Sequence, residues 1–427
     1  MRKTSNPSGI PPGTMAVLML AVFTVSIGYG VVLPLLPYLI ERLLDAGSAR
    51  TQMSAQVSGA TGLLTGIYTL ALFLFAPMWG RMSDQHGRRV ILLAGLTGFG
   101  VTTLVFSLFE NLAGLYAERF LSGLFAAAVT PVALAVIADL ATSEEARARR
   151  LTFVSLAGIS GFLLGPMVGV FLAGGVSSVR ADPTTAASLT IPLAATAILA
   201  VLAAAAVFFT VSGEKPREAV TKGGSRDANI PVWLLPRLLA LAFVVSAGVG
   251  VFEVGLALRG KQELGLTQFQ IAAMFMECSL VMLVAQAIVF SPWVNPEATR
   301  WLIAPALAVL AAGLFLVPYA SNFMLMLAVV GAVAASAGVL SPILTYWVSS
   351  KAGAAQGAAL GKQTAAASLG VTVGSAAGGL LFDIALLPNA SFVLMTVLIV
   401  LGFFVSLSLP SLLVTRKLGP SVPVTQP

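Results

Sequence analysis

The chain has 427 residues, of which 58% are hydrophobic and only 10% are charged, and its net charge is +7. A soluble domain of this length needs more charge on its surface, so the composition predicts an integral membrane protein. The single Cys278 excludes a disulfide framework within the chain, and the single His86 excludes a histidine-rich metal site. We therefore expect no metal and no cofactor.

Apolar stretches long enough to cross a bilayer follow one another along the chain. A spanning helix needs roughly 20 apolar residues. The first stretch is too long for a cleaved signal peptide, so we expect it to remain as a span. The predicted fold class is an all-α integral membrane protein with twelve transmembrane helices. They lie near 15–37, 58–79, 89–109, 112–140, 151–173, 189–211, 236–258, 269–290, 300–318, 322–349, 358–382 and 390–412.

Basic residues in the predicted loops indicate the orientation of the chain. With both termini on the inner side, eighteen Lys and Arg residues fall in inner positions and five in outer positions. The positive-inside rule therefore predicts a multi-pass protein of the cell (inner) membrane with both termini cytoplasmic. The net charge is thus a signal of orientation in the lipid bilayer, and it gives no basic face for binding nucleic acid.

Two short patterns occur twice, about 220 residues apart along the sequence. Residues 25–31 (VSIGYGV) are similar to residues 245–251 (VSAGVGV), and residues 75–79 (FAPMW) to residues 290–293 (FSPW). The matches fall in corresponding spans and in the same order. They predict two pseudo-symmetric six-helix bundles, the layout of a transporter whose halves rock about a central site.

The predicted bundles are separated by a segment rich in Gly and charged residues, which is typical of a flexible linker. We place the N-terminal six-helix bundle at 1–211 and the cytoplasmic linker at 212–232. The C-terminal six-helix bundle, with a short tail, takes 233–427.

Glycines recur at three- and four-residue steps on three of the predicted spans, so that each set lies on one helix face. Small residues let helix backbones approach closely in lipid. We expect these faces to form a sliding seam between the two bundles. The sets are Gly158, Gly161, Gly165 and Gly169 with a kink at Pro166; Gly370, Gly374 and Gly378; and Gly59, Gly62 and Gly66.

The segment 80–89 (GRMSDQHGRR) places five ionisable side chains between two membrane-length stretches. Such a break is typical of a tight cytoplasmic turn, in which Gly87 supplies the turn. An anion is favoured at a helix N-terminus, so we expect Asp84 to cap the eleventh span near 358–362. We also expect Arg88 to pair with Asp139, at the inner end of the fourth span.

These motifs resemble those of the major facilitator superfamily, especially its twelve-span drug:proton antiporter branch, and the resemblance covers nearly the whole chain. The family's loop pattern G-x-L-A-D-R-x-G-R-R is matched at Gly80, Asp84, Gly87, Arg88 and Arg89, with Met, Ser and Gln in place of its Leu, Ala and first Arg.

Two further motifs carry the resemblance. Arg119 and Gly123 are similar to the family's fourth-span motif, and residues 161–169 (GFLLGPMVG) to its fifth-span antiporter motif, although Val170 replaces the final Gly. The resemblance implies export of a hydrophobic, drug-like molecule in exchange for protons by alternating access. It also implies that the loop cluster latches the halves and that Arg119 takes part in proton transfer.

Arg119 lies roughly 10 Å inside the fourth span, counted at 1.5 Å per residue. A charge at that depth costs a few kcal/mol unless it faces a cavity or a partner. Glu118 points about 100° away on a helix, so we expect it to be a poor partner. Snorkelling of Arg119 to the outer headgroups remains the alternative.

Glu277 and Glu253 are the other charges expected inside the membrane. The first span has no acidic residue, so Glu253 or Glu277 would have to couple transport to protons. Burial favours the neutral form of a carboxyl group, which can then exchange a proton. By depth, Glu277 is the first candidate for proton coupling and Glu253 the second. The residues Tyr29, Phe252, Met274 and Tyr346 are candidates for an adaptable substrate cavity.

Other functions stay open at this point. A proton-coupled symporter that imports a small metabolite would need several charged groups for a polar substrate, and the spans offer few. A non-transporting sensor or assembly protein on the same fold would tolerate loss of Arg119 and Asp84, yet both are present. An intramembrane enzyme would need a paired nucleophile and base, and none is visible. We expect a monomer that binds a small molecule and protons.

Overall fold

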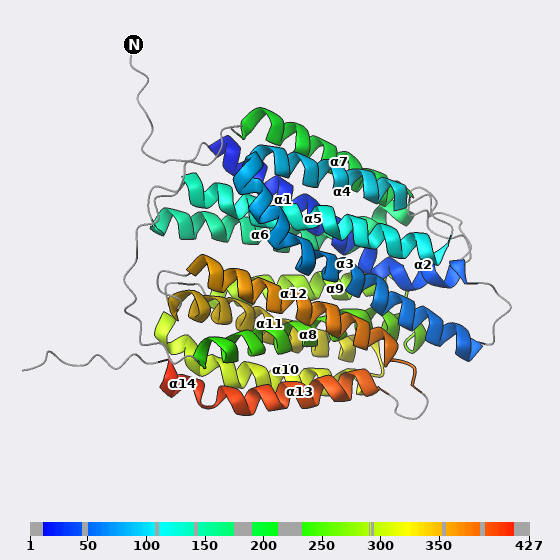
Figure 1. Cartoon of the computed structure of the whole chain (residues 1–427). Coiled ribbons are helices and arrows are strands. Elements are labelled where there is room, and N and C mark those ends of the chain that lie inside the picture. Colours follow the sequence, from blue (N-terminus) through cyan, green and yellow to red (C-terminus); the bar gives the residue numbers. More distant parts are fainter. Residues whose placement is uncertain are drawn as a thin grey trace, which may run out of the picture.

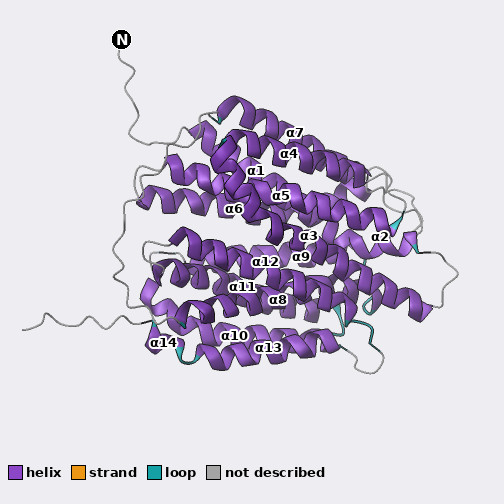
Figure 2. Cartoon of the chain, in the orientation of Figure 1, coloured by secondary structure: helices purple, strands orange, loops and turns teal. Residues whose placement is uncertain are grey.

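The computed structural model describes residues 12–44, 50–106, 111–140, 144–174, 190–211, 233–289, 291, 294–351, 356–384 and 389–413. Every regular element within these ranges is a helix, and none of them is a strand (Figure 2). The expected all-α class is confirmed.

The helices follow the order of the predicted spans. The first part of the chain contains α1 (Pro12–Val32), η1 (Leu33–Leu35), α2 (Leu36–Leu43), α3 (Arg50–His86), α4 (Arg88–Phe106), α5 (Leu112–Leu140), α6 (Glu144–Gly174) and α7 (Thr190–Thr210). The second part contains α8 (Leu234–Gln262), α9 (Gln268–Val289), η2 (Pro296–Leu302), α10 (Ile303–Leu316), η3 (Val317–Tyr319), α11 (Phe323–Lys351), α12 (Gln356–Leu380), α13 (Ala390–Ser406) and α14 (Leu409–Leu412).

Ten helical segments within the described ranges are long and apolar enough to cross a membrane. They correspond to the first ten predicted spans, so the chain is a multi-pass helical membrane protein. The eleventh and twelfth predicted spans form α12 and α13, but α13 has only 17 residues and α12 is rich in Gly, Ala, Ser and Thr. The count of twelve therefore stays a prediction for these last two helices.

The helices lie in two groups, one above the other in Figure 1. The N-terminal group contains α1 to α7, and the C-terminal group contains α8 to α14. The predicted linker at 212–232 lies outside the described residues. The domain limits at 1–211 and 233–427 therefore stay a prediction.

The two repeated segments pack in the same way in the two groups. A Cβ atom on Gly30 of α1 would lie 3.2 Å from the Cα of Gly165 in α6. At the equivalent position in α8, a Cβ on Gly250 would lie 2.9 Å from the backbone nitrogen of Ser375 in α12. In each group, the repeated glycine thus lets the first helix approach the fifth closely, which supports the predicted pseudo-symmetry.

Two of the three glycine faces lie between helices of the same group. The prediction that they form a seam between the two bundles is therefore wrong. A Cβ on Gly161, for example, would lie 2.6 Å from the carbonyl oxygen of Phe23 in the same group. The faces are Gly161, Gly165 and Gly169 in α6, which meet α1 with Pro166 beside them, and Gly370, Gly374 and Gly378 in α12, which meet α8. A glycine face predicts close approach, but it does not identify the partner helix.

The third glycine face does lie between the groups, as expected. A Cβ on Gly62 of α3 would lie 2.5 Å from the carbonyl oxygen of Ser375 and 2.7 Å from the Cα of Gly379, both in α12. A Cβ on Gly66 would lie 3.1 Å from the carbonyl oxygen of Thr372. The pair α3–α12, with the pair α6–α9, joins the two groups.

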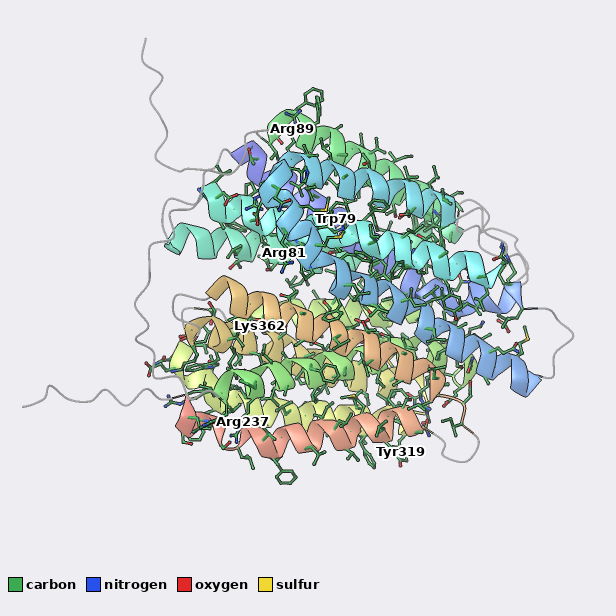
Figure 3. The ribbon with its side chains drawn as sticks, in the orientation of Figure 1. Trp79, Arg81, Arg89, Arg237, Tyr319 and Lys362 are labelled. Carbon is green, nitrogen blue, oxygen red and sulfur yellow. The ribbon has the colours of Figure 1, made fainter. Side chains whose placement is uncertain are left out.

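Basic side chains mark one end of the molecule. Arg81, Arg89, Arg237 and Lys362 lie toward the end at which α1 begins and α7 ends, whereas Tyr319 lies toward the opposite end (Figure 3). We call these the basic end and the far end. The distribution agrees with the prediction that the basic end faces the cytoplasm.

Candidate functional site

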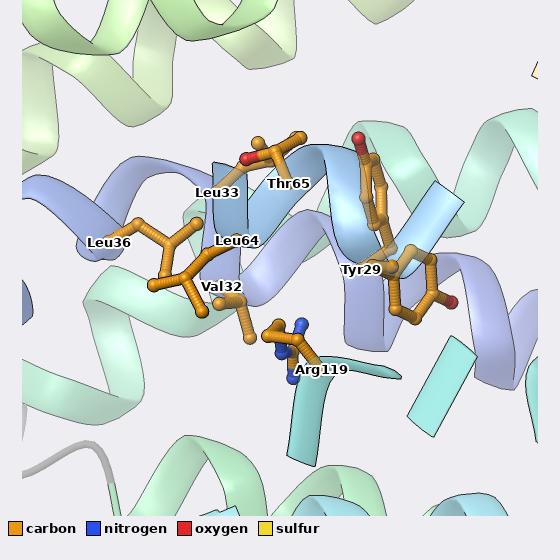
Figure 4. Close-up of a pocket in the computed structure, with 8 residues that line it drawn as sticks. Tyr29, Val32, Leu33, Leu36, Leu64, Thr65 and Arg119 are labelled. Carbon is orange, nitrogen blue, oxygen red and sulfur yellow. The ribbon is translucent and has the colours of Figure 1, made fainter. Parts of the chain in front are cut away.

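A small cavity lies in the N-terminal group, between α1, η1, α2, α3 and α5 (Figure 4). The space open to the centre of a water-sized sphere is about 10 Å³, roughly what a single water molecule needs, whereas ligand pockets commonly measure about 300–1,000 Å³. Its lining consists of Tyr29, Val32, Leu33, Leu36, Leu64, Thr65, Tyr68 and Arg119. The cavity thus combines aromatic and apolar surface with one cationic side chain. In this state it is too small for a drug-sized molecule and would have to widen to admit one.

Arg119 is buried and forms an ion pair with its neighbour Glu118. Its Nε donates to Oε2 of Glu118 at 2.8 Å, and its Nη2 donates to Oε1 at 3.4 Å. The expectation that Glu118 is a poor partner is therefore wrong. The two Cβ atoms do diverge on the helix, but both side chains are long enough to turn toward each other. In a medium of low dielectric, paired charges are strongly favoured over separate ones.

Two aromatic rings also contact the Arg119 guanidinium. Its central carbon lies 4.7 Å from the ring centroid of Phe106 and 5.6 Å from that of Tyr68. A cation over an aromatic face is attracted by the ring quadrupole. Arg119 is therefore held inside the group by a carboxylate and two rings, and it does not snorkel to the headgroup region.

Tyr29 connects the cavity with the C-terminal group. Its ring stacks on Tyr68, with centroids 5.1 Å apart, and on Phe162, with centroids 5.7 Å apart. Its hydroxyl donates to Oε2 of Glu253 in α8 at 3.2 Å. Because Tyr29 lines the cavity, a single hydrogen bond links the cavity wall to a carboxyl group of the other group of helices.

Glu277 has a different environment. It lies in α9 and is partly exposed. Its Oε2 is buried and has no hydrogen-bond partner among the described residues. A Cβ on Gly331 of α11 would lie 3.4 Å from its Oε1. The structure therefore brings Glu253, and not Glu277, into contact with a residue of the cavity.

The other residues predicted for a substrate cavity lie elsewhere. Phe252 and Met274 are buried in an apolar cluster that contains side chains of both groups of helices. Tyr346 is 36% exposed, and its ring packs edge-on against Trp347 with centroids 5.3 Å apart. Of the four candidates, Tyr29 lines the cavity, and a place for the other three on the substrate path stays a prediction.

The loop between α3 and α4 is organised around Arg88. Its Nη1 lies 2.5 Å from Oδ1 of Asp84 and donates to the hydroxyl of Ser83 at 2.6 Å. Its Nε donates to Oδ2 of Asp139 in α5 at 2.9 Å. The expected pair between Arg88 and Asp139 is present, and it joins two helices of the N-terminal group.

Three further loop residues complete the motif. Gly87 has a φ of 96°, a conformation that side chains disfavour and that lets α3 end next to α4. The Arg89 guanidinium lies 4.1 Å from the ring centroid of Phe208 in α7. Gly80 has open space where a Cβ would be. Close packing therefore does not explain a glycine at this position.

Asp84 is exposed, with 61% of its side chain accessible. The side chains at 356–358, where α12 begins, lie outside the described residues, so the expected cap of this helix by Asp84 stays a prediction. A gating role of the loop cluster also stays a prediction. This cluster consists of Gly80, Asp84, Gly87, Arg88, Arg89 and Asp139.

At the far end, the two groups are joined by a polar network. The sequence analysis did not predict this network. The Ser58 hydroxyl donates to Oδ2 of Asp383 at 2.5 Å, and the Ser54 hydroxyl donates to the same atom at 3.2 Å. Oε1 of Gln262 lies 3.1 Å from the Ser54 hydroxyl and is a second acceptor for its one hydrogen. The available signal was positional, since Gln262 and Asp383 are polar residues at the ends of two predicted spans.

A second set of contacts closes the same end. Lys261 pairs with Glu41 and donates to the carbonyl oxygen of Pro37 at 2.7 Å. The Tyr38 hydroxyl donates to the carbonyl oxygen of Leu266 at 2.9 Å. These contacts hold α2 against α8 and the turn that follows it, so the groups are joined at the far end in this structure.

Solved structures share this fold. The human organic anion transporter MFSD10 (TETRAN) matches with a TM-score of 0.69 and 21% sequence identity, over 93% of this chain and all of that one. A bacterial homolog of the human lysosomal transporter Spinster, in an inward-facing and unoccupied conformation, matches with a TM-score of 0.70 and 14% identity, over 96% and 100%.

Residues 18–361 match the family model of the Major Facilitator Superfamily, and the chain belongs to this family. Among named relatives, "Multidrug resistance protein 2" of Bacillus subtilis is 27% identical over 370 residues, which cover 86% of this chain and 88% of that protein. "Quinolone resistance protein NorA" of Staphylococcus aureus is 25% identical over 375 residues, with 86% and 89% covered.

Proposed function

We propose that this transporter exports a hydrophobic, drug-like small molecule in exchange for protons by alternating access. Relatives named as multidrug and quinolone resistance proteins align with most of the chain, which supports efflux and this substrate class. The cavity lining of aromatic and aliphatic side chains supports a lipophilic compound over a strongly polar metabolite.

The observation that carries the proposal is the hydrogen bond from Tyr29 to Glu253. It places a carboxyl group where the two groups of helices meet and beside the cavity. A carboxyl group favours its neutral form when it is buried and its ionised form when water reaches it. Movement of the groups that breaks this bond would expose Glu253, and proton release would thereby be coupled to the change of access.

The proposed cycle uses the two groups as rocking units. Residues 1–211 and 233–427 move against each other, with 212–232 as a cytoplasmic linker. Both termini and the basic end face the cytoplasm, in the cell (inner) membrane, and the monomer is the transporting unit. The contacts of Lys261 and Asp383 close the outer side in the present state and open when substrate leaves.

Proton flux in proteoliposomes tests this function. Liposomes containing the purified protein and a trapped pH indicator receive lipophilic cations, anions and neutral compounds in turn. We expect at least one compound to move protons in the direction opposite to its own transport. Movement of compound and protons in the same direction would instead identify a symporter, and compound movement without protons would overturn the coupling.

The loop motif provides a separate prediction. Asp84→Asn removes an anion that contacts Arg88 and that we expect at the end of α12, and it should slow transport by about two- to tenfold. Transport rates in proteoliposomes, normalised to folded protein, measure the effect. Arg81→Gln, at another exposed position of the same loop, is the control. Equal rates for Asp84→Asn and the wild type would show that the loop only sets topology.

A further inference from the structure

Glu118 is a buried carboxyl group that the proposed transport cycle does not use. It is 1% exposed and does not line the cavity, whereas Arg119, which it binds through both carboxylate oxygens, does. A buried acid that costs free energy to desolvate therefore calls for a reason.

The charge of Arg119 dominates the cavity unless it is cancelled. The remaining lining side chains are aromatic, aliphatic or, at Thr65, a hydroxyl. Charges several Å apart interact strongly where water is scarce, so an uncompensated guanidinium would attract a lipophilic anion and repel a cation. The Glu118 carboxylate lies 2.8 Å from the guanidinium, and at a distance the pair is close to neutral.

Because the pair of Arg119 and Glu118 is close to neutral, the aromatic rings decide which charge of ligand the cavity favours. Tyr29 and Tyr68 stack on each other and both line the cavity. Aromatic faces attract cations and repel anions. A cavity with a neutral ion pair and two tyrosine rings therefore suits lipophilic cations and uncharged compounds.

We infer that Glu118 sets the charge selectivity of the transporter: by pairing with Arg119, it makes the cavity accept lipophilic cations and neutral compounds and reject lipophilic anions. The inference rests on the proposed function, because it takes the lining of this cavity, widened from its present size, as part of the substrate site. Glu118 is a positioning residue that acts through Arg119 and does not touch the compound.

Two probes of nearly the same shape and opposite charge test the inference. Tetraphenylphosphonium is the cation and tetraphenylborate is the anion. Their dissociation constants are measured by equilibrium binding to the purified full-length protein in one detergent, so that partitioning of each probe into micelles is the same for every variant. The readout is the ratio of the two constants, which no proton gradient or transport step affects.

Opposite shifts of this ratio are the expected result. Glu118→Gln leaves the Arg119 guanidinium without its counter-charge. The ratio should then shift in favour of tetraphenylborate by at least about tenfold relative to the wild type. Arg119→Gln leaves the Glu118 carboxylate without its counter-charge and should shift the ratio in favour of tetraphenylphosphonium. The double variant is neutral again and should return toward the wild-type ratio. Glu297→Gln, at an exposed acid of η2 in the C-terminal group, is the matched control and should not shift it.

A purely structural role of the pair predicts something else. In that case the two single variants weaken both probes alike, and an unchanged ratio or shifts in one direction overturn the inference, as does a wild type that binds neither probe. If Glu118→Gln does not fold, Arg119→Gln and the double variant still decide. Opposite shifts without proton flux in proteoliposomes would support the selectivity and refute only the proposed antiport.

Discussion

Glu253→Gln is expected to abolish transport driven by a proton gradient while substrate binding and downhill exchange remain. Gln has nearly the same shape, and its carbonyl oxygen can still accept the hydrogen bond from Tyr29. It cannot bind and release a proton, so it cannot couple a gradient to export. Accumulation against a gradient and substrate exchange without one, measured in the same proteoliposomes, separate the two effects.

Tyr29→Phe and Glu277→Gln are the comparisons for this prediction. Phe keeps the ring that stacks on Tyr68 but removes the hydroxyl that donates to Glu253, so coupling should weaken without being lost. Glu277 contacts no cavity residue in the described part of the chain, and Glu277→Gln should still pump.

Transport measurements on the two Glu→Gln variants would also show if Glu277, and not Glu253, is the proton-coupling residue. Loss of pumping in Glu277→Gln, together with normal pumping in Glu253→Gln, would assign coupling to the carboxyl group that depth in the membrane favours. Normal pumping in both variants would place the coupling on other groups, such as Asp139 and Arg119, or show that transport is not driven by protons. The contacts favour Glu253, since depth alone does not show which carboxyl group meets the other group of helices.

The helices were predictable because each span is a long apolar run, and the membrane requires its backbone hydrogen bonds to be satisfied within the helix. The ion pair of Arg88 with Asp139 was also predictable, because both lie at the same end of neighbouring spans. In such cases position along the chain fixes position in depth, and opposite charges at one depth find each other.

Partners across the interface could not be derived in the same way. Ser58 and Asp383 are 325 residues apart, and nothing local in the sequence indicates that their helices touch. The prediction that Glu118 is a poor partner of Arg119 was wrong for another reason. The helix fixes the direction of Cβ atoms, but side-chain rotamers depend on the surrounding dielectric and on which partners are present.

The glycine faces show the same limit. Spacing correctly predicted that α3, α6 and α12 approach other helices closely, because small residues permit such contact. Two of the three faces nevertheless pack inside one group. Periodicity reports that a helix face is small, and the identity of the neighbouring helix comes from the tertiary arrangement.

Gly62→Ala is expected to prevent the two groups from closing at the α3–α12 contact. The added methyl group would lie 2.5 Å from the carbonyl oxygen of Ser375 and 2.7 Å from the Cα of Gly379. Both are backbone atoms, which cannot rotate away as a flexible side chain could, so the helices must separate. Overpacking of this kind typically costs about 1–3 kcal/mol.

In the proposed cycle this contact opens when the groups move apart, so the cost should fall on the closed state. A penalty of that size shifts the balance between states by roughly 5- to 150-fold, and transport should fall with it. Gly59→Ala, one turn away on the same helix, is the matched control. Its Cβ would lie 3.6 Å from Leu380 Cδ2, an ordinary contact, so this variant should transport normally.

The distance across the far end distinguishes a shifted equilibrium from damage to the fold. Spin labels at Arg42→Cys and Thr267→Cys, in a Cys278→Ser background, lie on exposed positions of opposite groups. In Gly62→Ala the distance distribution should move from the short, closed population to a longer one, while the protein stays folded in the membrane. A short distance together with normal transport would mean that α3 and α12 can part without consequence, and the seam would then not be the moving contact of the cycle.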